Sequence, residues 1–480
     1  MRHTAALVRI MALVVCMTAL LLIPALLFAA LAGERWVPFA APLAAVLLVA
    51  GPPALFLRTG PIRLSPREGF LVVFLTWAFA TLLGAAPYLL SGLGIGAADS
   101  IFESAAAFAT TGGTTIADLE ALPRSLHLWR SVSHWAGGMG IVLLSVALMP
   151  LFGVGGFQLV KAETPGPEKE KITPRVAASA KIIWIVYSGL TITLIGLYRI
   201  GGMGWFDAFC HGLTTMATGG VSTRNGGIAS FGSAFIEGTT VVFMLLSALN
   251  FNLYYRLLKG RWHDVWQSTE FRVYLGLFAG SLVIVTWSVL PLYGSLPSAL
   301  RYASFQTASI LSSSGSASAP FDAWPPLAQA VLFCLMFVGG CSGSTAGGLK
   351  VIRCAVLFKQ ARNEIRRILY PQGIFSIQLN RKVGRLDLIY GVAGFVFLYF
   401  FVILCVTLVT ALSGVDLFTS FSAAVAMLGN MGVGFGGIAP GATYGAFAPH
   451  IKLLYALVMI AGRLELWTVF VLFTPGYWRR

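Results

Sequence analysis

The residues best suited to chemistry in this sequence are four short stretches that combine glycine with threonine, serine or asparagine. They read TTGGT (110–114), ATGGVS (217–222), SSSGS (312–316) and NMGVG (430–434), and we name them the glycine stretches. Each of them follows a short apolar segment. Chain of this kind exposes backbone carbonyl oxygens, and rings of carbonyls can replace the hydration shell of an ion. The stretches therefore predict a cation site that is built from main chain around one axis.

A diverged repeat of about 100 residues relates the glycine stretches to one another. If Gly112, Gly219, Gly315 and Gly432 are equivalent, their separations are 107, 96 and 117 residues. Glycine suits such a site because it adopts φ values closed to other residues and places no side chain on the axis. One stretch alone would favour a loop or a helix contact, whereas four favour a pore. The residues predicted to bind the cation are Thr110, Thr111, Gly112, Gly113, Thr218, Gly219, Gly220, Ser313, Ser314, Gly315, Ser316, Asn430, Met431, Gly432 and Val433.

The elements that must position these stretches are membrane helices. The 480 residues are 57% hydrophobic and 11% charged, with a mean hydropathy of +0.81, and no soluble fold hides that much apolar surface. Ten runs are long enough to span a bilayer: 8–31, 36–57, 67–91, 127–151, 176–198, 231–257, 273–295, 325–357, 387–412 and 447–474. Four shorter runs fit re-entrant helices: 100–109, 205–216, 298–311 and 417–428. The C-terminal ends of these short helices carry partial negative charge, which favours a cation.

The net charge of +15 is distributed in alternation along the chain. The basic connections are those at 58–67, 161–175, 256–272 and 353–385, followed by Arg479 and Arg480. This is the pattern of cytoplasmic loops, so we predict that both termini are cytoplasmic and that the charge does not serve to bind nucleic acid. Docking of an acidic cytoplasmic partner is a second role open to the same residues. The first run ends in a sequence similar to a signal-peptidase site at 30–32, but its length of about 20 residues favours a retained helix.

One predicted run is too long for a single straight crossing. The segment 325–357 contains GGCSGSTAGG (339–348), which forms helix poorly, so we predict a break there. Chain without helix at this depth lines a water-filled space, or else its small residues form a close helix contact. Arg463, near the middle of the last run, costs at least about 2.5–3.5 kcal/mol in a membrane and normally faces a cavity or a partner. Glu465 is not spaced to pair with it along a helix, so Arg463 either faces the pore or binds helix-end carbonyls.

Other motifs in the sequence indicate no enzymatic site. GVGFGG (432–437) and GSTAGGLK (343–350) superficially match nucleotide-binding loops, but neither has the context or spacing that such loops need. The six cysteines and six histidines are scattered, so we predict neither a disulfide framework nor a zinc site. We expect His134 and His211 to form local hydrogen bonds. With no cluster of acid, base and nucleophile, the chain is predicted not to be an enzyme and to carry no cofactor.

Several motifs together give the chain a resemblance to a known family. They are FESAAAFATTGGT, FDAFCHGLTTMATGGVST, FQTASILSSSG, GGCSGSTAGGLKVIR, and GNMGVGFG followed by GRLELWTVFVLFTP. Over essentially its full length the sequence resembles the Trk/Ktr/HKT superfamily of potassium uptake proteins, and within it the bacterial TrkH family. The resemblance implies an all-α polytopic membrane protein with two extra N-terminal helices (1–64). Four pseudo-symmetric helix–pore-helix–helix repeats (65–160, 161–262, 263–368 and 369–480) would then surround a central pore.

The resemblance also implies roles for particular residues. The filter glycines would be Gly112, Gly219, Gly315 and Gly432, with potassium as the permeant ligand. The third filter departs from the family, because Ser313, Ser314 and Ser316 stand where relatives usually have threonine, alanine and a bulky or aromatic residue. A gate is implied in the third repeat, where an intramembrane loop obstructs the pathway beside an arginine: Gly343, Ser344, Thr345, Gly347, Gly348 and Arg463. The implied partners are potassium ions, membrane lipid, a second copy of the chain in a homodimer, and a cytoplasmic TrkA-type nucleotide-binding regulatory protein.

Potassium uptake across the bacterial inner membrane through a selective, channel-like pore is therefore the predicted function. The alternative is a secondary transporter that couples potassium entry to sodium or protons. A proton relay needs a chain of buried carboxylates, whereas the candidates Glu103 and Asp207 lie at the starts of predicted pore helices. A membrane-embedded enzyme is the third possibility, and no cluster of reactive groups supports it.

Overall fold

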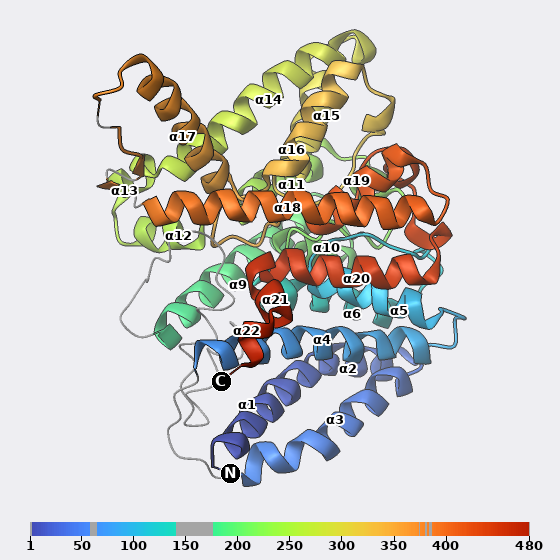
Figure 1. Cartoon of the computed structure of the whole chain (residues 1–480). Coiled ribbons are helices and arrows are strands. Elements are labelled where there is room, and N and C mark those ends of the chain that lie inside the picture. Colours follow the sequence, from blue (N-terminus) through green and yellow to red (C-terminus); the bar gives the residue numbers. More distant parts are fainter. Residues whose placement is uncertain are drawn as a thin grey trace.

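The computed structural model describes residues 2–57, 65–140, 176–373, 375–379, 382–383 and 386–479. Most of the described elements are helices, which confirms the all-α class (Figure 1). The strands in the described residues are β1 (Gln378–Leu379) and β2 (Lys382–Val383), which pair antiparallel. The second part of the predicted run 127–151 and the predicted basic residues at 58–63 and 161–175 lie outside the described residues.

The N-terminal helices form a hairpin at one side of the molecule. The helix α1 (Arg2–Ala19) continues through η1 (Leu20–Leu22) into α2 (Ile23–Ala32), and α3 (Val37–Phe56) returns beside it. Both α1 and α3 pack against α4 (Pro66–Leu90), at the lower edge of the view in Figure 1. The two predicted runs 8–31 and 36–57 are thus confirmed as helices.

The rest of the chain repeats one order of elements: a long helix, a short helix, and a second helix. The long helices are α4, α9 (Val176–Ile200), α14 (Thr269–Tyr293) and α18 (Leu386–Leu412). The short helices are α5 (Ala97–Phe108), α10 (Trp205–Met216), α15 (Leu296–Leu311) and α19 (Leu417–Leu428). The second helices are α6 (Arg124–Gly138), α11 (Ala234–Ser247) with α12 (Phe251–Leu258), α16 (Pro326–Val338) with α17 (Val351–Leu369), and α20 (Pro449–Leu464) with α21 (Leu466–Phe470). The other helical elements of the described residues are short: α13 (Trp262–Gln267), α22 (Pro475–Trp478), η3 (Gly227–Phe231), η4 (Phe321–Ala323), η5 (Gly436–Ile438), η6 (Tyr444–Ala446) and η7 (Val471–Phe473).

Local signals in the sequence set where several helices begin. At the start of α4, Ser65 and Glu68 form a reciprocal capping box, and Pro66 occupies the first helical position, where its missing N–H is harmless. At the start of α19, the Asp416 side chain accepts a hydrogen bond from Thr419 N at 2.9 Å. The short helices α5, α15 and α19 are buried at the centre, where alanine-rich faces allow close packing.

Breaks interrupt the second helices of at least three repeats. Six described helices are long and apolar enough to cross a membrane, or up to eight if each bent pair counts as one span. The pairs α11–α12 and α20–α21 are bent by 92° and 114°. The predicted runs 231–257 and 447–474 are therefore each divided into two helices by a bend, which the sequence did not predict. Asn250 caps α12 by accepting a hydrogen bond from Asn252 N at 2.9 Å, and Glu465 ends α20 with a φ of 67°. In the third repeat, the break between α16 and α17 falls where the sequence predicts it.

Candidate functional site

The four short helices α5, α10, α15 and α19 all end in the same backbone motif. The second residue beyond each helix has a positive φ although it is not glycine: Thr110 (55°), Thr218 (55°), Ser313 (54°) and Asn430 (52°). Its N–H donates to the carbonyl three residues earlier and the next N–H donates to the carbonyl five residues earlier, as in Thr110 N to Ala107 O (3.1 Å) and Thr111 N to Ala106 O (2.8 Å). This is a Schellman motif, which normally places glycine at this position. Strain repeated four times at one point indicates a functional constraint.

A glycine two residues after each strained residue aligns the glycine stretches. These glycines have φ between 60° and 76°: Gly112, Gly220, Gly315 and Gly432. Their separations are 108, 95 and 117 residues. The predicted equivalence of Gly219 is therefore wrong by one residue, and Gly220 takes its place. Gly219 has no positive φ, and it must be small because a Cβ there would collide with the ring of His134.

The aligned glycines close a ring around the four repeats. A Cβ added at Gly112 would collide with the carbonyl oxygen of Gly219. The same relation joins Gly220 to Ser314, Gly315 to Met431 and Gly432 to Thr111. Each glycine thus lies against the carbonyl that precedes the glycine of the next repeat, and the fourth repeat meets the first. The structure therefore brings the four predicted stretches together, and any side chain at the aligned glycines would displace backbone.

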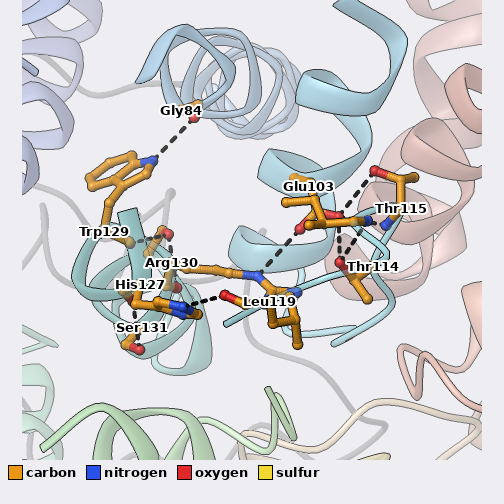
Figure 2. Close-up of polar contacts among 11 residues, drawn as sticks. Gly84, Glu103, Thr114, Thr115, Leu119, His127, Trp129, Arg130 and Ser131 are labelled. Atoms are coloured by element: carbon orange, nitrogen blue, oxygen red, sulfur yellow. Dashed lines mark hydrogen bonds and ion pairs between the residues drawn. The ribbon is translucent and has the colours of Figure 1, made fainter. Parts of the chain in front are cut away.

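A buried carboxylate supports the first glycine stretch from behind. Glu103 on α5 accepts hydrogen bonds from Thr114 Oγ1 (2.7 Å), at the end of the stretch, and from Thr115 N (2.6 Å), directly after it (Figure 2). Its other carboxylate oxygen lies 3.3 Å from Arg130 Nε of α6, and both side chains are buried. Removing either partner would leave a buried charge uncompensated, which is strongly destabilising. Glu103 is therefore committed to holding the stretch in place.

Neutral side chains occupy the place of Glu103 in the second and third repeats. His211 Nε2 is hydrogen-bonded to Ser222 Oγ (2.9 Å), and Gln306 Nε2 donates to Ala319 O (3.3 Å). The local hydrogen bonds predicted for His211 are thus confirmed. His134 Nδ1, in contrast, is buried without a hydrogen-bond partner among the described residues.

The serines of the third glycine stretch connect it to its surroundings. Ser313 Oγ accepts a hydrogen bond from Gly347 N at 2.6 Å. The carbonyl of Ser316 accepts one from Ser309 Oγ at 2.5 Å, and Ser316 Oγ donates to Gly220 O at 3.4 Å. Ser314 Oγ is buried and has no partner among the described residues. Of the serines that depart from the family pattern, Ser313 and Ser316 therefore form hydrogen bonds that connect this stretch to the loop and to the second stretch.

The loop at 339–348, which we name the intramembrane loop, lies against both the ring and the break in α11–α12. Cys341 N donates to Ala248 O (2.9 Å), and Thr345 Oγ1 donates to Ser247 O (3.0 Å). A Cβ at Gly347 would collide with Gly429 O, directly before the fourth stretch. Gly347 is thus glycine because the loop approaches backbone of the ring closely.

Arg463 joins the intramembrane loop to the end of α6. Its guanidinium donates to the carbonyl of Thr345 in the loop, and also to the carbonyls of Gly137 (2.8 Å) and Gly138. Arg463 therefore binds helix-end carbonyls, one of the two environments predicted from the sequence, and also contacts the loop beside which the family resemblance places an arginine. Of the predicted gate residues, Gly347, Thr345 and Arg463 take part in these contacts.

Sequence reasoning missed the charged residues at the two breaks beside the loop. Lys350 and Glu465 both have positive φ, 76° and 67°. Arg353 Nη2 lies 2.6 Å from Glu465 Oε1, so an ion pair connects the start of α17 to the bend between α20 and α21. The available signal was charge inside apolar runs, which normally marks a functional or paired group.

Comparisons with known proteins agree on one family. A family model for TrkH, described as cation transport protein, matches residues 39–479. The Trk system potassium uptake protein TrkH of Escherichia coli K12 is 38% identical over 423 residues, covering 87% of both chains. That of Halomonas elongata is 37% identical over 486 residues, covering 98% of both. The crystal structure of the potassium transporter TrkH from Vibrio parahaemolyticus superposes with a TM-score of 0.88 at 32% identity, covering 99% of this chain and 100% of that one.

Proposed function

The chain belongs to the TrkH family of cation transport proteins, and from that premise we propose that it takes up potassium across the bacterial inner membrane through the ring of glycine stretches. It is a polytopic membrane transporter and not an enzyme. The observation that carries the proposal is the closed ring, in which each aligned glycine lies against a carbonyl of the next repeat.

Main-chain carbonyls in such a ring would replace the hydration shell of potassium. Discrimination between cations then depends on how many carbonyls face the ion and how firmly they are held. The side chains behind the ring support this role, because Glu103, His211 and Gln306 each bind the last residue of a stretch or the chain just beyond it. The ends of the short helices add partial negative charge, which favours a cation.

We propose that the intramembrane loop is the gate, and that the described arrangement is closed. Ser313 ties the loop to the ring, and Arg463 donates hydrogen bonds to the loop carbonyl of Thr345. A fixed positive charge about 4 Å from a permeating cation repels it by about 4 kcal/mol at an effective dielectric constant of 20. Arg463 would therefore oppose conduction both by its charge and by holding the loop.

Control by a cytoplasmic partner is part of the proposal. In the described residues, basic side chains lie on α12, on α17 and in the connection between α12 and α13, which are segments predicted to be cytoplasmic: Arg256, Lys259, Arg261, Lys359, Arg362, Arg366 and Arg367. With both termini on that side, as the alternating charge predicts, these segments would face a TrkA-type nucleotide-binding regulator. A homodimer would present two such sets of segments to it.

Ion-flux measurement in reconstituted vesicles tests the function. Potassium and rubidium should pass much faster than sodium or lithium, and equal sodium and potassium flux would overturn the proposal. Clamping the sodium and proton gradients separates a channel-like pore from the coupled transporter, because only the latter should stop when its coupling gradient is removed. Among the described buried carboxylates, Glu103 is paired with Arg130 and Glu237 with Arg301 (2.7 Å). Glu270 accepts a hydrogen bond from Ser342 N (2.6 Å), so each of the three has a partner, which favours the uncoupled pore.

A further inference from the structure

The glycine stretches are supported in two different ways. In the second repeat, Thr214 Oγ1 on α10 donates to Val221 O at 2.9 Å, and in the third, Ser309 Oγ on α15 donates to Ser316 O. Each hydroxyl belongs to the residue four positions before the strained residue of its repeat, which is Thr218 or Ser313. Each binds the carbonyl three positions after that strained residue. The residues at the same place in the first and fourth repeats are Ala106 and Ala426, which carry no hydroxyl. These two stretches therefore need another donor.

Tyr444 supplies a donor to the fourth stretch, at the carbonyl of Gly432 rather than that of Val433, and also contacts the first stretch. It lies in η6, beyond the fourth stretch, and its hydroxyl donates to the carbonyl of the aligned glycine Gly432 at 3.0 Å. Its backbone N–H donates to Thr114 O at 2.8 Å. A Cβ added at Gly113 would lie 3.1 Å from the aromatic ring of Tyr444, so this side chain packs directly against the first stretch. One residue thus bridges the two stretches that lack a supporting hydroxyl.

The surroundings of Tyr444 fix its ring in one position. The residue is 2% exposed, and its ring centroid lies 5.2 Å from that of Phe102, 5.4 Å from that of Phe447 and 6.0 Å from that of Tyr455. Aromatic neighbours at these distances pack favourably and resist rotation of the ring. The hydroxyl is therefore held at the Gly432 carbonyl by contacts independent of the ring of stretches.

We propose that Tyr444 is a positioning residue that sets cation selectivity, by orienting the Gly432 carbonyl and holding the fourth stretch at a fixed distance from the first. The inference rests on the proposed potassium-conducting function. When the Tyr444 hydroxyl is removed, the Gly432 carbonyl loses a hydrogen bond and becomes free to turn. The ring of glycine stretches can then adapt to a smaller ion. The loss should therefore appear in the ratio of potassium to sodium flux rather than in the amount of folded protein.

The test compares Tyr444→Phe with Tyr455→Phe in the full-length chain reconstituted in vesicles. Tyr455 belongs to the same aromatic cluster, but its hydroxyl is hydrogen-bonded to Thr410 Oγ1 (3.0 Å), away from the glycine stretches. Tyr444→Phe keeps the ring and should lower the potassium-to-sodium flux ratio by roughly two- to tenfold, the change that one ordinary hydrogen bond produces. Tyr455→Phe should keep the wild-type ratio.

Potassium flux and sodium flux are both measured per inserted molecule, so that a folding defect does not alter the potassium-to-sodium flux ratio. If the wild-type chain selects potassium and Tyr444→Phe selects it equally well, the inference fails while the proposed function stands. An equal loss of selectivity in both variants would also overturn it, because general loosening of the cluster would then suffice. A wild-type chain that passes sodium as readily as potassium would remove the proposed function, and the inference with it.

Discussion

At the scale of single residues, backbone strain in the described part of the chain gathers at the ring and the breaks. The described residues with positive φ that are not glycine are Thr110, Thr218, Ser313, Lys350, Asn430 and Glu465. Such conformations cost of order 1–3 kcal/mol each and persist only where surrounding contacts impose them. The stretches can be recognised in the sequence by their glycines. The sequence does not indicate that a threonine, a serine or an asparagine in them has a strained backbone conformation. The second stretch was misaligned for a similar reason, because Gly219 and Gly220 fit the sequence pattern equally. They are distinguished by the positive φ of Gly220 and by the packing of Gly219 against His134.

The two glycines of the second stretch should therefore respond differently to alanine. Gly220→Ala forces a methyl group onto the Ser314 carbonyl and gives alanine a φ of 60°, so potassium flux should be lost. Gly219→Ala collides with the His134 side chain, so a second change, His134→Ala, should restore flux. Vesicle flux of each variant with and without His134→Ala measures the difference. Rescue of Gly220→Ala by His134→Ala would show that the alignment is wrong.

At the scale of elements, the breaks of the second helices meet in one layer next to the ring. The intramembrane loop binds the break of α11–α12 through Ser247, and Arg463 at the end of α20 binds the end of α6 through Gly137. The sequence predicted the positions of the short helices and of the glycine-rich break. It missed the bends after α11 and α20, because those segments are apolar and their freed backbone groups find partners on other elements. Such partners are invisible in a local pattern, although buried backbone groups must have them.

The hydrogen bond from Gly347 to Ser313 predicts that the ring and the loop are coupled. Ser313→Ala removes the acceptor and leaves a buried N–H unsatisfied, at a cost of about 1–3 kcal/mol, so the loop should detach more easily and basal flux should rise. The matched control is Ser314→Ala, because the Ser314 hydroxyl is buried without a partner among the described residues. Basal flux in vesicles without added regulator measures both. Equal flux in the two variants would mean that this hydrogen bond does not restrain the loop.

Arg463 provides a second test of the loop as a gate. Arg463→Ala removes both the charge and the hydrogen bonds to Thr345, Gly137 and Gly138, so flux per inserted molecule should increase while potassium selectivity is kept. Arg463→Lys retains the charge but not the planar fork of donors, and should give an intermediate flux. Deletion within 343–348 should act in the same direction. Normal insertion of Arg463→Ala with unchanged or lower flux would exclude the arginine from the gate.

At the scale of the whole molecule, the alternating charge and the repeated order of helices predict the same membrane topology. Between the loop that follows the second glycine stretch and the helix α17, the chain passes the bent pair α11–α12, the long helix α14 and the broken pair α16–α17. The short helix α15 enters and returns on one side. Counting the bent pair, the long helix and the broken pair as one crossing each, we predict that the two ends lie on opposite sides of the membrane. The loops of the first and second repeats lie on the same side, because Asn225 Nδ2 donates to Asp118 Oδ1 at 2.8 Å. The alternating charge predicts that this side is external.

Cysteine labelling tests this topology with two matched positions. Ala229 lies near Asn225, Ala361 lies on α17 one turn before the basic residues Arg366 and Arg367, and both alanines are exposed. In a background without the native cysteines, Ala229→Cys should react with a membrane-impermeant thiol reagent added to intact cells. Ala361→Cys should react only after the membrane is opened, because the positive charge around it keeps that segment in the cytoplasm. Labelling of both residues from the same side would require an even number of crossings between them. It would contradict both the counting of each bent pair as one span and the prediction that each of the four repeats starts and ends in the cytoplasm.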